Sequence, residues 1–183
     1  MKNLPPIRKI MIANLLVIFL LPATTFAQDW GRYDISFSGC SAYFPSEPEW
    51  DFSYSDDSSF VWVGEVTEGN IYIGLICIEF SEAFPYDASS DDLIYVTENY
   101  LDYLMGEFEI VSHTGYETGY KLESNYDAIG ISDRWEDNVG DHWVIRAWID
   151  PYNMVVMYMY GSLDDDFYAY EDYYFNNFEF PGE

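Results

Sequence analysis

Residues 60–80 carry the clearest pattern of apolar and polar positions in the chain. Over residues 60–67 the alternate positions separate into two sets, Phe60, Trp62, Gly64 and Val66 against Val61, Val63 and Glu65. This period of two is typical of a β-strand. Glu68-Gly69-Asn70 supplies a turn, so residues 71–80 are expected to form the second strand of a hairpin. Both faces of that strand are apolar, which predicts a central position covered from both sides.

Two other segments have the spacing of amphipathic helices. In the first, Ser89 or Ser90 can cap the helix, Asp91 and Asp92 suit its positive end, and Gly106 can end it. Its apolar face is predicted to consist of Leu93, Val96, Tyr100, Leu101 and Leu104. The second helix is expected to be capped by Ser162, with Asp164–Asp166 in its first turn. Its buried stripe would be Leu163, Phe167, Tyr170 and Tyr174.

The remaining segments read as short strands joined by turns rich in Gly, Asp, Asn and Pro. Strands are expected at residues 41–44, 50–54, 108–112, 120–126, 129–136, 143–149 and 154–160, with a last extended piece at Phe178–Phe180. They follow one another without a helix between each pair. We therefore predict an α+β fold, a largely antiparallel sheet covered by the two helices in an α/β/α-type sandwich.

The first 27 residues have the composition of a secretory signal peptide. Lys2, Arg8 and Lys9 precede an apolar run over residues 10–21, and small residues follow at Thr25 and Ala27. The run is shorter than the roughly 20 apolar residues of a membrane span. We expect cleavage after Ala27, a periplasmic or secreted location, and a single α+β domain over residues 28–183.

Acidic residues outnumber basic ones by 33 to 7, for a formal net charge of −26. Only Arg32, Lys121, Arg134 and Arg146 follow the expected cleavage site. Such a surface excludes non-specific nucleic-acid binding and disfavours anionic membranes. Aromatic residues make up 20% of the chain, which argues for a folded domain because disordered segments are poor in aromatics.

The acidity has three competing explanations: adaptation to salt, binding of divalent cations, or repulsion that keeps the protein monomeric. Calcium would need carboxylates that converge in a loop, and Asp56-Asp57, Asp137 with Asp141, and Asp164–Asp166 are the candidates. No Asp-x-Asp-x-Asp-Gly loop is present in the sequence. We expect no cofactor, and calcium remains the alternative.

Cys40 and Cys77 are the only cysteines. In an oxidising compartment two thiols favour a disulfide, which would be worth ~3–4 kcal/mol in the chain-entropy model. The alternative is a pair of buried thiols that never meet.

The sequence contains no recognisable catalytic constellation. His113 and His142 are the only histidines, and neither a Gly-x-Ser-x-Gly elbow nor a His-Glu-x-x-His motif occurs. We therefore expect a protein that is not an enzyme. Asp133, Glu136 and Asp137 beside Trp135 keep one alternative open, a carbohydrate-binding module or weak glycan hydrolase.

The aromatic strands suggest a binding surface. Trp143, Ile145, Ala147 and Ile149 share one face of their strand, and Val144, Arg146 and Trp148 share the other. If one face is left uncovered, it presents aromatic side chains around Arg146, a composition typical of interfaces. The candidate binding residues are Arg146, Trp148, Trp135 and Tyr158, and the expected ligand is a protein partner or envelope assembly.

Three short motifs resemble the Mog1/PsbP-like fold, found in many small exported bacterial proteins. They are Ser41-Ala-Tyr-Phe-Pro45-Ser-Glu-Pro48, Gly115-Tyr-Glu-Thr-Gly119-Tyr-Lys-Leu-Glu123 and Phe175-Asn-Asn-Phe178-Glu-Phe180. Asn177 stands where the family pattern has serine. The resemblance implies a docking or accessory protein and carries no catalytic residues over to this chain.

Thermal unfolding in calcium, magnesium and sodium chloride at matched ionic strength tests the role of the acidity. We expect the same rise of the midpoint in all three salts, because screening of repulsion does not distinguish between cations. A saturated calcium site would instead add ~2.7 kcal/mol in calcium alone, a shift of several degrees.

Overall fold

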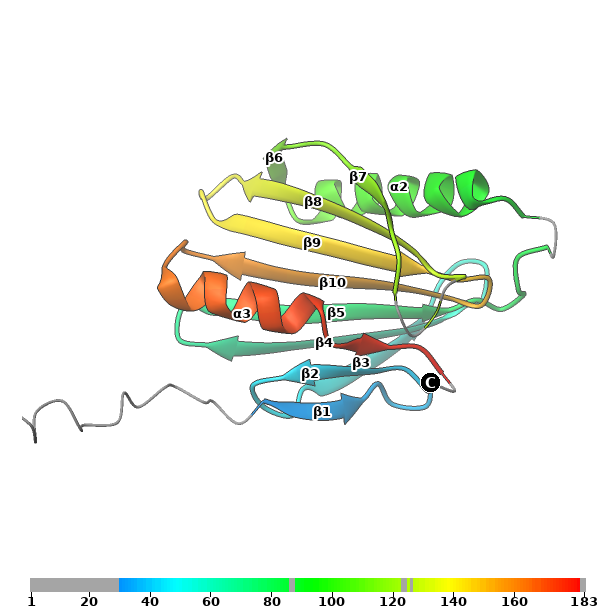
Figure 1. The fold of residues 1–183 in the computed structure, drawn as a ribbon, viewed down its shortest axis with the longest axis horizontal. Helices are drawn as coiled ribbons and strands as arrows, with labels where there is room; N and C mark the ends of the chain where they lie inside the picture. The colour runs from blue at the N-terminus through cyan, green and yellow to red at the C-terminus, as the bar shows by residue number, and fades with distance from the viewer. Residues whose placement is uncertain (1–29, 86–87, 123–124, 126, 182–183) are drawn as a thin grey trace, which may run out of the picture.

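A computed structural model describes residues 30–85, 88–122, 125 and 127–181 (Figure 1). The predicted signal peptide lies outside these residues. With the labels of Figure 1, the elements are β1 (Gly31–Asp34), β2 (Ser41–Phe44), β3 (Glu49–Tyr54), β4 (Phe60–Glu68), β5 (Ile71–Glu79), α2 (Ser90–Glu107), β6 (Ile110–His113), β7 (Glu117–Tyr120), β8 (Ile129–Asp137), β9 (His142–Ile149), β10 (Asn153–Gly161), α3 (Asp165–Phe175) and β11 (Phe178–Glu179).

The strands form two sheets, and every described pairing is antiparallel. The large sheet has the order β3-β4-β5-β10-β9-β8-β6, with β7 also paired to β8, and the small sheet has the order β1-β2-β11. The predicted α+β class, with mostly antiparallel strands and two helices, is confirmed. No helix in the described ranges has both the length and the apolar character needed to cross a membrane.

Alternation along the central strands separates two buried clusters, one on each side of the large sheet. On β10, Val155, Met157 and Met159 belong to the first cluster. Met154, Val156 and Tyr158 of the same strand belong to the second. The same division runs along β5, so the expectation of a central strand buried on both faces is confirmed.

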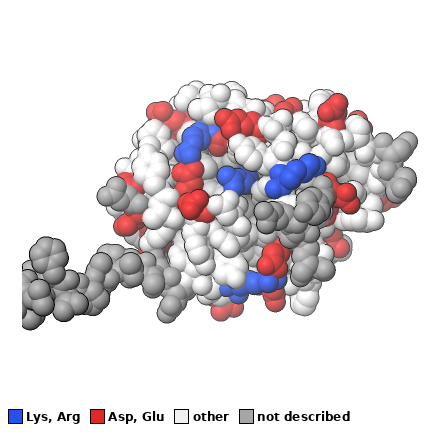
Figure 2. Space-filling view, viewed as in Figure 1, with Lys and Arg blue, Asp and Glu red and all other residues white. Residues whose placement is uncertain are grey.

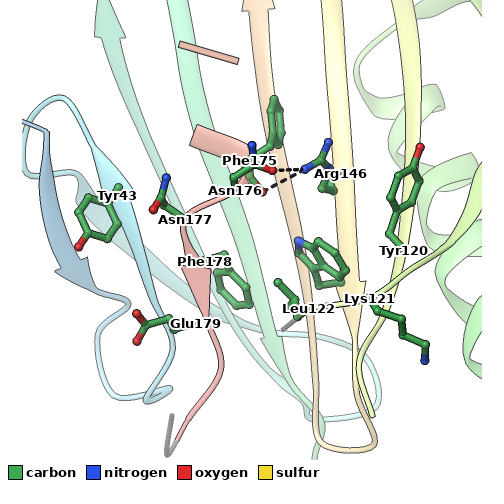
Figure 3. A pocket seen from close by; sticks show the side chains of 11 residues that line it. Tyr43, Tyr120, Lys121, Leu122, Arg146, Phe175, Asn176, Asn177, Phe178 and Glu179 are labelled. Carbon is green, nitrogen blue, oxygen red and sulfur yellow. Dashed lines mark hydrogen bonds between the residues drawn. The ribbon is translucent and has the colours of Figure 1, made fainter. Parts of the chain in front are cut away.

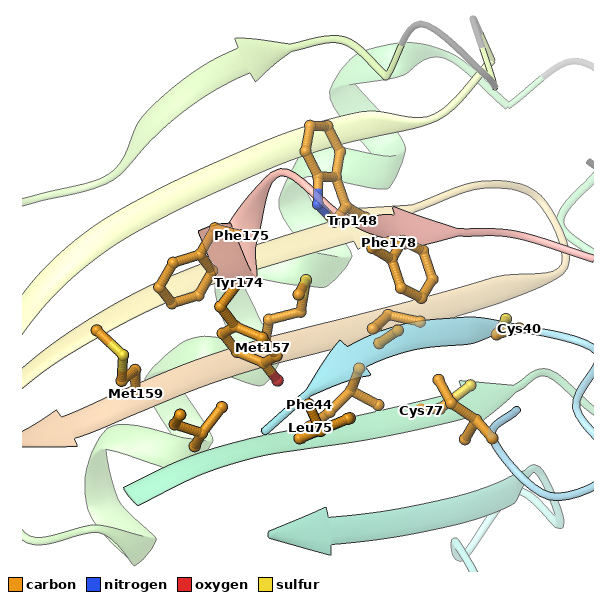
Figure 4. Close-up of a cluster of buried hydrophobic side chains, with 14 of the residues drawn as sticks. Cys40, Phe44, Leu75, Cys77, Trp148, Met157, Met159, Tyr174, Phe175 and Phe178 are labelled. Carbon is orange, nitrogen blue, oxygen red and sulfur yellow. The ribbon is translucent and has the colours of Figure 1, made fainter. Parts of the chain in front are cut away.

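The helices contribute to different clusters. Phe167, Tyr174 and Phe175 of α3 join the first cluster, together with Phe44 of β2 and Phe178 of β11 (Figure 4). Leu93, Leu101 and Leu104 of α2 join the second. In Figure 1, α3 lies in front of the large sheet. The face of the sheet toward α3 is therefore the one on which the C-terminal segment and the small sheet gather.

Local hydrogen bonds explain where the helices begin. Ser89, one of the two candidates predicted, caps α2, and it forms a capping box with Asp92. Thr97 is fully buried on this helix although the sequence did not single it out, and its hydroxyl donates to the carbonyl of Leu93. Asp164 caps α3, accepting from the backbone N–H of Phe167 at 2.9 Å. The expected cap at Ser162 is wrong, and Leu163 lies outside the helix and is exposed.

Two strand predictions need correction. The segment expected at 108–112 begins at Ile110, because Phe108 is the C-cap of α2 and Glu109 adopts a φ of 54°. Of the strand expected at 120–126, only Tyr120 is in a strand, as the last residue of β7, and residues 123, 124 and 126 lie outside the described part of the chain. β7 and β1 are short, and neither has buried residues at every second position. They therefore lack the apolar alternation from which a strand is predicted.

Cys40 and Cys77 are both fully buried, and both are free thiols in the structure, so the disulfide stays a prediction. They lie at the same end of the first cluster (Figure 4). A hydrogen bond with the Cys77 thiol, followed by burial, raises the pKa of Cys40. The two thiols are therefore neighbours across the junction of the small and large sheets.

Because these thiols are neighbours in a protein expected to be exported, we predict that the protein isolated from an oxidising compartment contains the Cys40–Cys77 bond. Its mass should be lower by two hydrogens, and reduction should lower the free energy of unfolding by about 3 kcal/mol. A Cys77→Ala variant is the control, since reductant should not change its midpoint. Full alkylation of both thiols in the denatured, unreduced protein would contradict the prediction.

Candidate ligand-binding site

Strand β9 positions the candidate site through its alternation. Val144 and Trp148 belong to the first cluster, so Arg146 between them points to the same side of the sheet. Trp148 pairs with Gly130 of β8. A Cβ at Gly130 would lie 2.4 Å from Cζ3 of Trp148 and 2.6 Å from Cβ of Tyr120. Glycine is therefore required at this position for the indole to lie across the neighbouring strand.

The guanidinium of Arg146 is held by the C-terminal end of α3. Its Nη1 donates to the carbonyl oxygen of Phe175 at 3.2 Å and to Oδ1 of Asn176 at 3.1 Å (Figure 3). The guanidinium carbon also lies 5.7 Å from the ring centre of Tyr120 and 5.4 Å from that of Phe175. These contacts fix a positive charge against aromatic rings.

Burial lowers the pKa of Arg146, and the electrostatic influence of Tyr120, Glu171 and Asp172 opposes that shift. Among the described ion pairs, none includes Arg146. Its charge is balanced by carbonyl, amide and ring dipoles in place of a carboxylate. An arginine keeps its proton in proteins, so the site retains a positive charge.

Two buried donors at this site have no hydrogen-bond partner in the structure, Nε of Arg146 and Nε1 of Trp148. Trp148 is only 4% exposed. A buried donor without an acceptor costs about 1–3 kcal/mol, which is why such groups are rare in folded proteins. Both donors belong to residues that line one cavity.

The cavity has a volume of about 520 Å³ and lies between the end of α3, β11, β9 and the segment after β7 (Figure 3). Its aromatic and apolar lining consists of Tyr43, Tyr120, Leu122, Trp148, Phe175 and Phe178. Its polar lining consists of Lys121, Arg146, Asn176, Asn177 and Glu179. The size and the mixture of apolar walls with a few polar groups are typical of small-ligand sites.

The four basic residues that follow the predicted signal peptide all lie at this cavity or its border. Arg146 and Lys121 line it, and Arg134 lines an adjoining pocket that Arg146 shares. Arg32 forms a 2.6 Å ion pair with Glu179 of the lining. Figure 2 shows Lys and Arg side chains gathered on this face, which carries α3 in Figure 1. In a chain with 33 acidic residues, this is where an anionic group meets the least repulsion.

The four predicted binding residues do not share one surface. Arg146 and Trp148 lie on the α3 side of the large sheet, whereas Trp135 and Tyr158 belong to the cluster on the other side. Trp135 is 2% exposed and Tyr158 is 5% exposed. An aromatic face was expected only if one side of the sheet is uncovered, and that condition is not met at Trp148, which is buried in the first cluster with residues of α3 and β11.

The acids proposed for a sugar site have structural partners. Asp133 is buried, accepts from Nε1 of Trp135 at 2.9 Å, and lies 3.1 Å from Nδ1 of His113. Since the indole is buried and turned toward this carboxylate, Trp135 cannot serve as a stacking platform for a sugar. The geometry therefore gives the carbohydrate alternative no support at these residues.

Two of the acids proposed for calcium also have local roles. Asp137 accepts from Nε1 of Trp143 and from three backbone N–H groups of its own turn, among them that of Gly140. Burial opposes its ionisation, but these hydrogen bonds outweigh it and lower the pKa of Asp137. Asp164 caps α3. In the described part of the chain, no group of three or more His, Cys, Asp or Glu side chains is arranged to hold a metal ion.

Sequence reasoning missed two features. Phe175 and Asn176 hold the guanidinium of Arg146. They follow Arg146 by 29 and 30 positions in the chain, and no sequence pattern links them to it. The exposed aromatic side chains also gather elsewhere, on β3 and β4, where Phe52 contacts Tyr54 and stacks on Phe60 at 6.0 Å. The scarcity of basic residues was the signal that could have indicated the cavity.

Comparison with known proteins adds no assignment: the sequence matches no protein-family model and no curated protein. The resemblance to the Mog1/PsbP-like fold therefore stays a prediction, and the site is interpreted from its own geometry.

Gly130→Ala tests whether the indole of Trp148 depends on the missing side chain. The added methyl overlaps Trp148 and Tyr120, so we expect a loss of about 2 kcal/mol, or several degrees in the unfolding midpoint. Gly106→Ala in α2 is the matched control, because a Cβ there meets nothing within 4 Å. Equal midpoints for the two variants would contradict this account of the site.

Proposed function

We propose that this protein is an exported, non-enzymatic binding or accessory domain that docks on a protein partner or envelope assembly, with the Arg146 cavity as its binding site. The observation that carries the proposal is that two of the four basic residues, Lys121 and Arg146, line one cavity and the other two lie at its border, in an otherwise acidic chain. Proteins with a strong net charge select partners by local complementarity, and a basic spot in an acidic surface sets both position and orientation.

Exposed aromatic side chains support a macromolecular partner. Phe37 is 95% exposed beside the row of Phe52, Tyr54 and Phe60. Phe37, Phe52 and Phe60 line a second hollow with Trp62. Solvated aromatic clusters of this kind are typical of protein-docking surfaces.

The α/β/α sandwich of the Mog1/PsbP-like fold belongs to the same proposal. It is supported by the membership of α2 and α3 in buried clusters on opposite sides of the large sheet. An accessory role fits this arrangement, because the described residues present a cavity and an aromatic row.

Crosslinking in the host's own envelope or secreted fraction tests the proposal. Arg146→Gln removes the fixed charge, and we expect it to weaken the complex with the wild-type protein's partner roughly tenfold or more. Asn99→Asp is the matched control, since it changes the net charge by the same amount at an exposed position of α2, on the other side of the large sheet. Equal recovery of every partner by wild type and Arg146→Gln would reject the cavity as the binding site.

A further inference from the structure

Building on the proposed binding role, we infer that the cavity takes a carboxylate attached to an apolar body, with Arg146 and Nε1 of Trp148 as the donors that hold the carboxylate. The inference starts from the two unpartnered donors. Both residues line the same cavity and lie on the same face of β9. Positions i and i+2 on a strand are about 6.6 Å apart. Two long side chains at this spacing can both contact one small group.

A carboxylate fits these donors better than a neutral acceptor. Its two oxygens offer about four acceptor positions, and the arginine fork matches them in one plane. Nη1 of Arg146 already donates hydrogen bonds to Phe175 and Asn176, and these bonds fix the orientation of the guanidinium before a ligand binds. The remaining donors are thus held in position, and binding requires little further ordering of the side chain.

The charges around the cavity favour one negative charge over two. Glu179 lines the cavity, and Glu171 and Asp172 influence the guanidinium of Arg146. Glu179 is paired with Arg32 and Glu171 with Arg134, so these two basic residues are already engaged by acids of the chain. A phosphate dianion is usually bound by several cations or a helix N-terminus. A monovalent carboxylate needs only the single fixed charge that Arg146 provides.

The rest of the lining selects an apolar body. Leu122, Phe178 and Tyr43 contribute apolar or aromatic surface at a distance along the cavity from the guanidinium. Figure 3 places Phe178 and Leu122 between Tyr43 and Lys121, below the Arg146 contact with α3. A volume of about 520 Å³ accommodates a group the size of a medium alkyl chain or an aromatic side chain.

Two sources supply this chemistry: a free organic acid with an alkyl or aryl body, or the C-terminal carboxylate of a polypeptide that ends in an apolar residue. The second source would join the cavity to docking on a protein partner. Both present the same group to Arg146 and Trp148, so the experiment has one arm for each.

The test uses the purified exported protein and follows the indole N–H of Trp148 in two-dimensional proton–nitrogen NMR spectra. The Trp148→Phe variant assigns that resonance. Hexanoate and phenylacetate are titrated against hexanamide and hexyl phosphate, and a short peptide ending in leucine is compared with its C-terminally amidated form. We expect a saturable shift of the Trp148 resonance with the carboxylates and none with the amides.

Variants separate the inference from a general effect of charge. Arg146→Gln should weaken hexanoate binding about tenfold or more, whereas Asn99→Asp, which makes the same change of net charge on α2 at the other face of the sheet, should leave it unchanged. Trp148→Phe keeps an aromatic ring and removes the donor, so calorimetry should show weaker hexanoate binding without loss of the folded state. This variant keeps the inference testable if Arg146→Gln fails to fold.

Binding by free acids, by the free-carboxylate peptide or by both supports the inference and identifies the source. Equal binding of hexanamide, tighter binding of hexyl phosphate, or an unmoved indole resonance would overturn it. Loss of partner crosslinking in Arg146→Gln without any carboxylate binding would leave the proposed function standing and reject this inference. Carboxylate binding by the wild-type protein together with unchanged partner crosslinking in Arg146→Gln would support this inference and reject the cavity as the site of partner docking.

Discussion

The hydroxyl of Tyr174 donates a 2.6 Å hydrogen bond to the carbonyl oxygen of Gly74, and this contact determines where the C-terminal segment lies. Tyr174 is fully buried in α3, and Gly74 is in the central strand β5. On the other face of the sheet the ring of Tyr158 occupies the space that a side chain at Gly74 would need. Gly74 is therefore in contact with a tyrosine on each face of the sheet, and its hydrogen bond with Tyr174 helps to fix the position of α3.

The binding site depends on this placement of α3. Phe175 follows Tyr174 directly, and its carbonyl holds the guanidinium of Arg146. A shift of the helix would remove that acceptor and open the wall formed by Asn176 and Phe178. The buried hydrogen bond between Tyr174 and Gly74 of β5 thus helps to position the positive charge of Arg146, which is on β9. The two unpartnered donors are a local cost to stability at this site.

Several of the acids that give the chain its charge also support its turns. Asp150 accepts from the backbone N–H groups of Tyr152 and Asn153 at 2.8 and 2.7 Å, and Asp137 does the same in the turn before β9. Burial raises the pKa of Asp150, while these hydrogen bonds oppose the rise. At these positions acidity and fold are linked, because a carboxylate replaces the backbone acceptor that a tight turn lacks.

The strong local patterns in the sequence were sufficient for the main elements. Period-two alternation identified the strands around Trp62, Leu75 and Met157, and the serine before Asp91 and Asp92 identified the start of α2. Local patterns could not identify β1 and β7, whose exposed residues carry no apolar period. They also missed the cap of α3, where two polar residues compete and the structure uses Asp164.

The amino-acid sequence by itself determined the period of each strand, and hence that Arg146 and Trp148 point to the same side of β9. Only the tertiary structure decided what faces them, because the carbonyl of Phe175, Asn176 and the glycine beneath the indole come from segments far away in the chain. The sequence likewise showed that basic residues are few. Their convergence on one cavity results from the pairing of β8 with β9 and the return of the C-terminal segment to β2. Side-chain alternation is a local property of the backbone, whereas a cavity depends on contacts between distant segments, which no local pattern encodes.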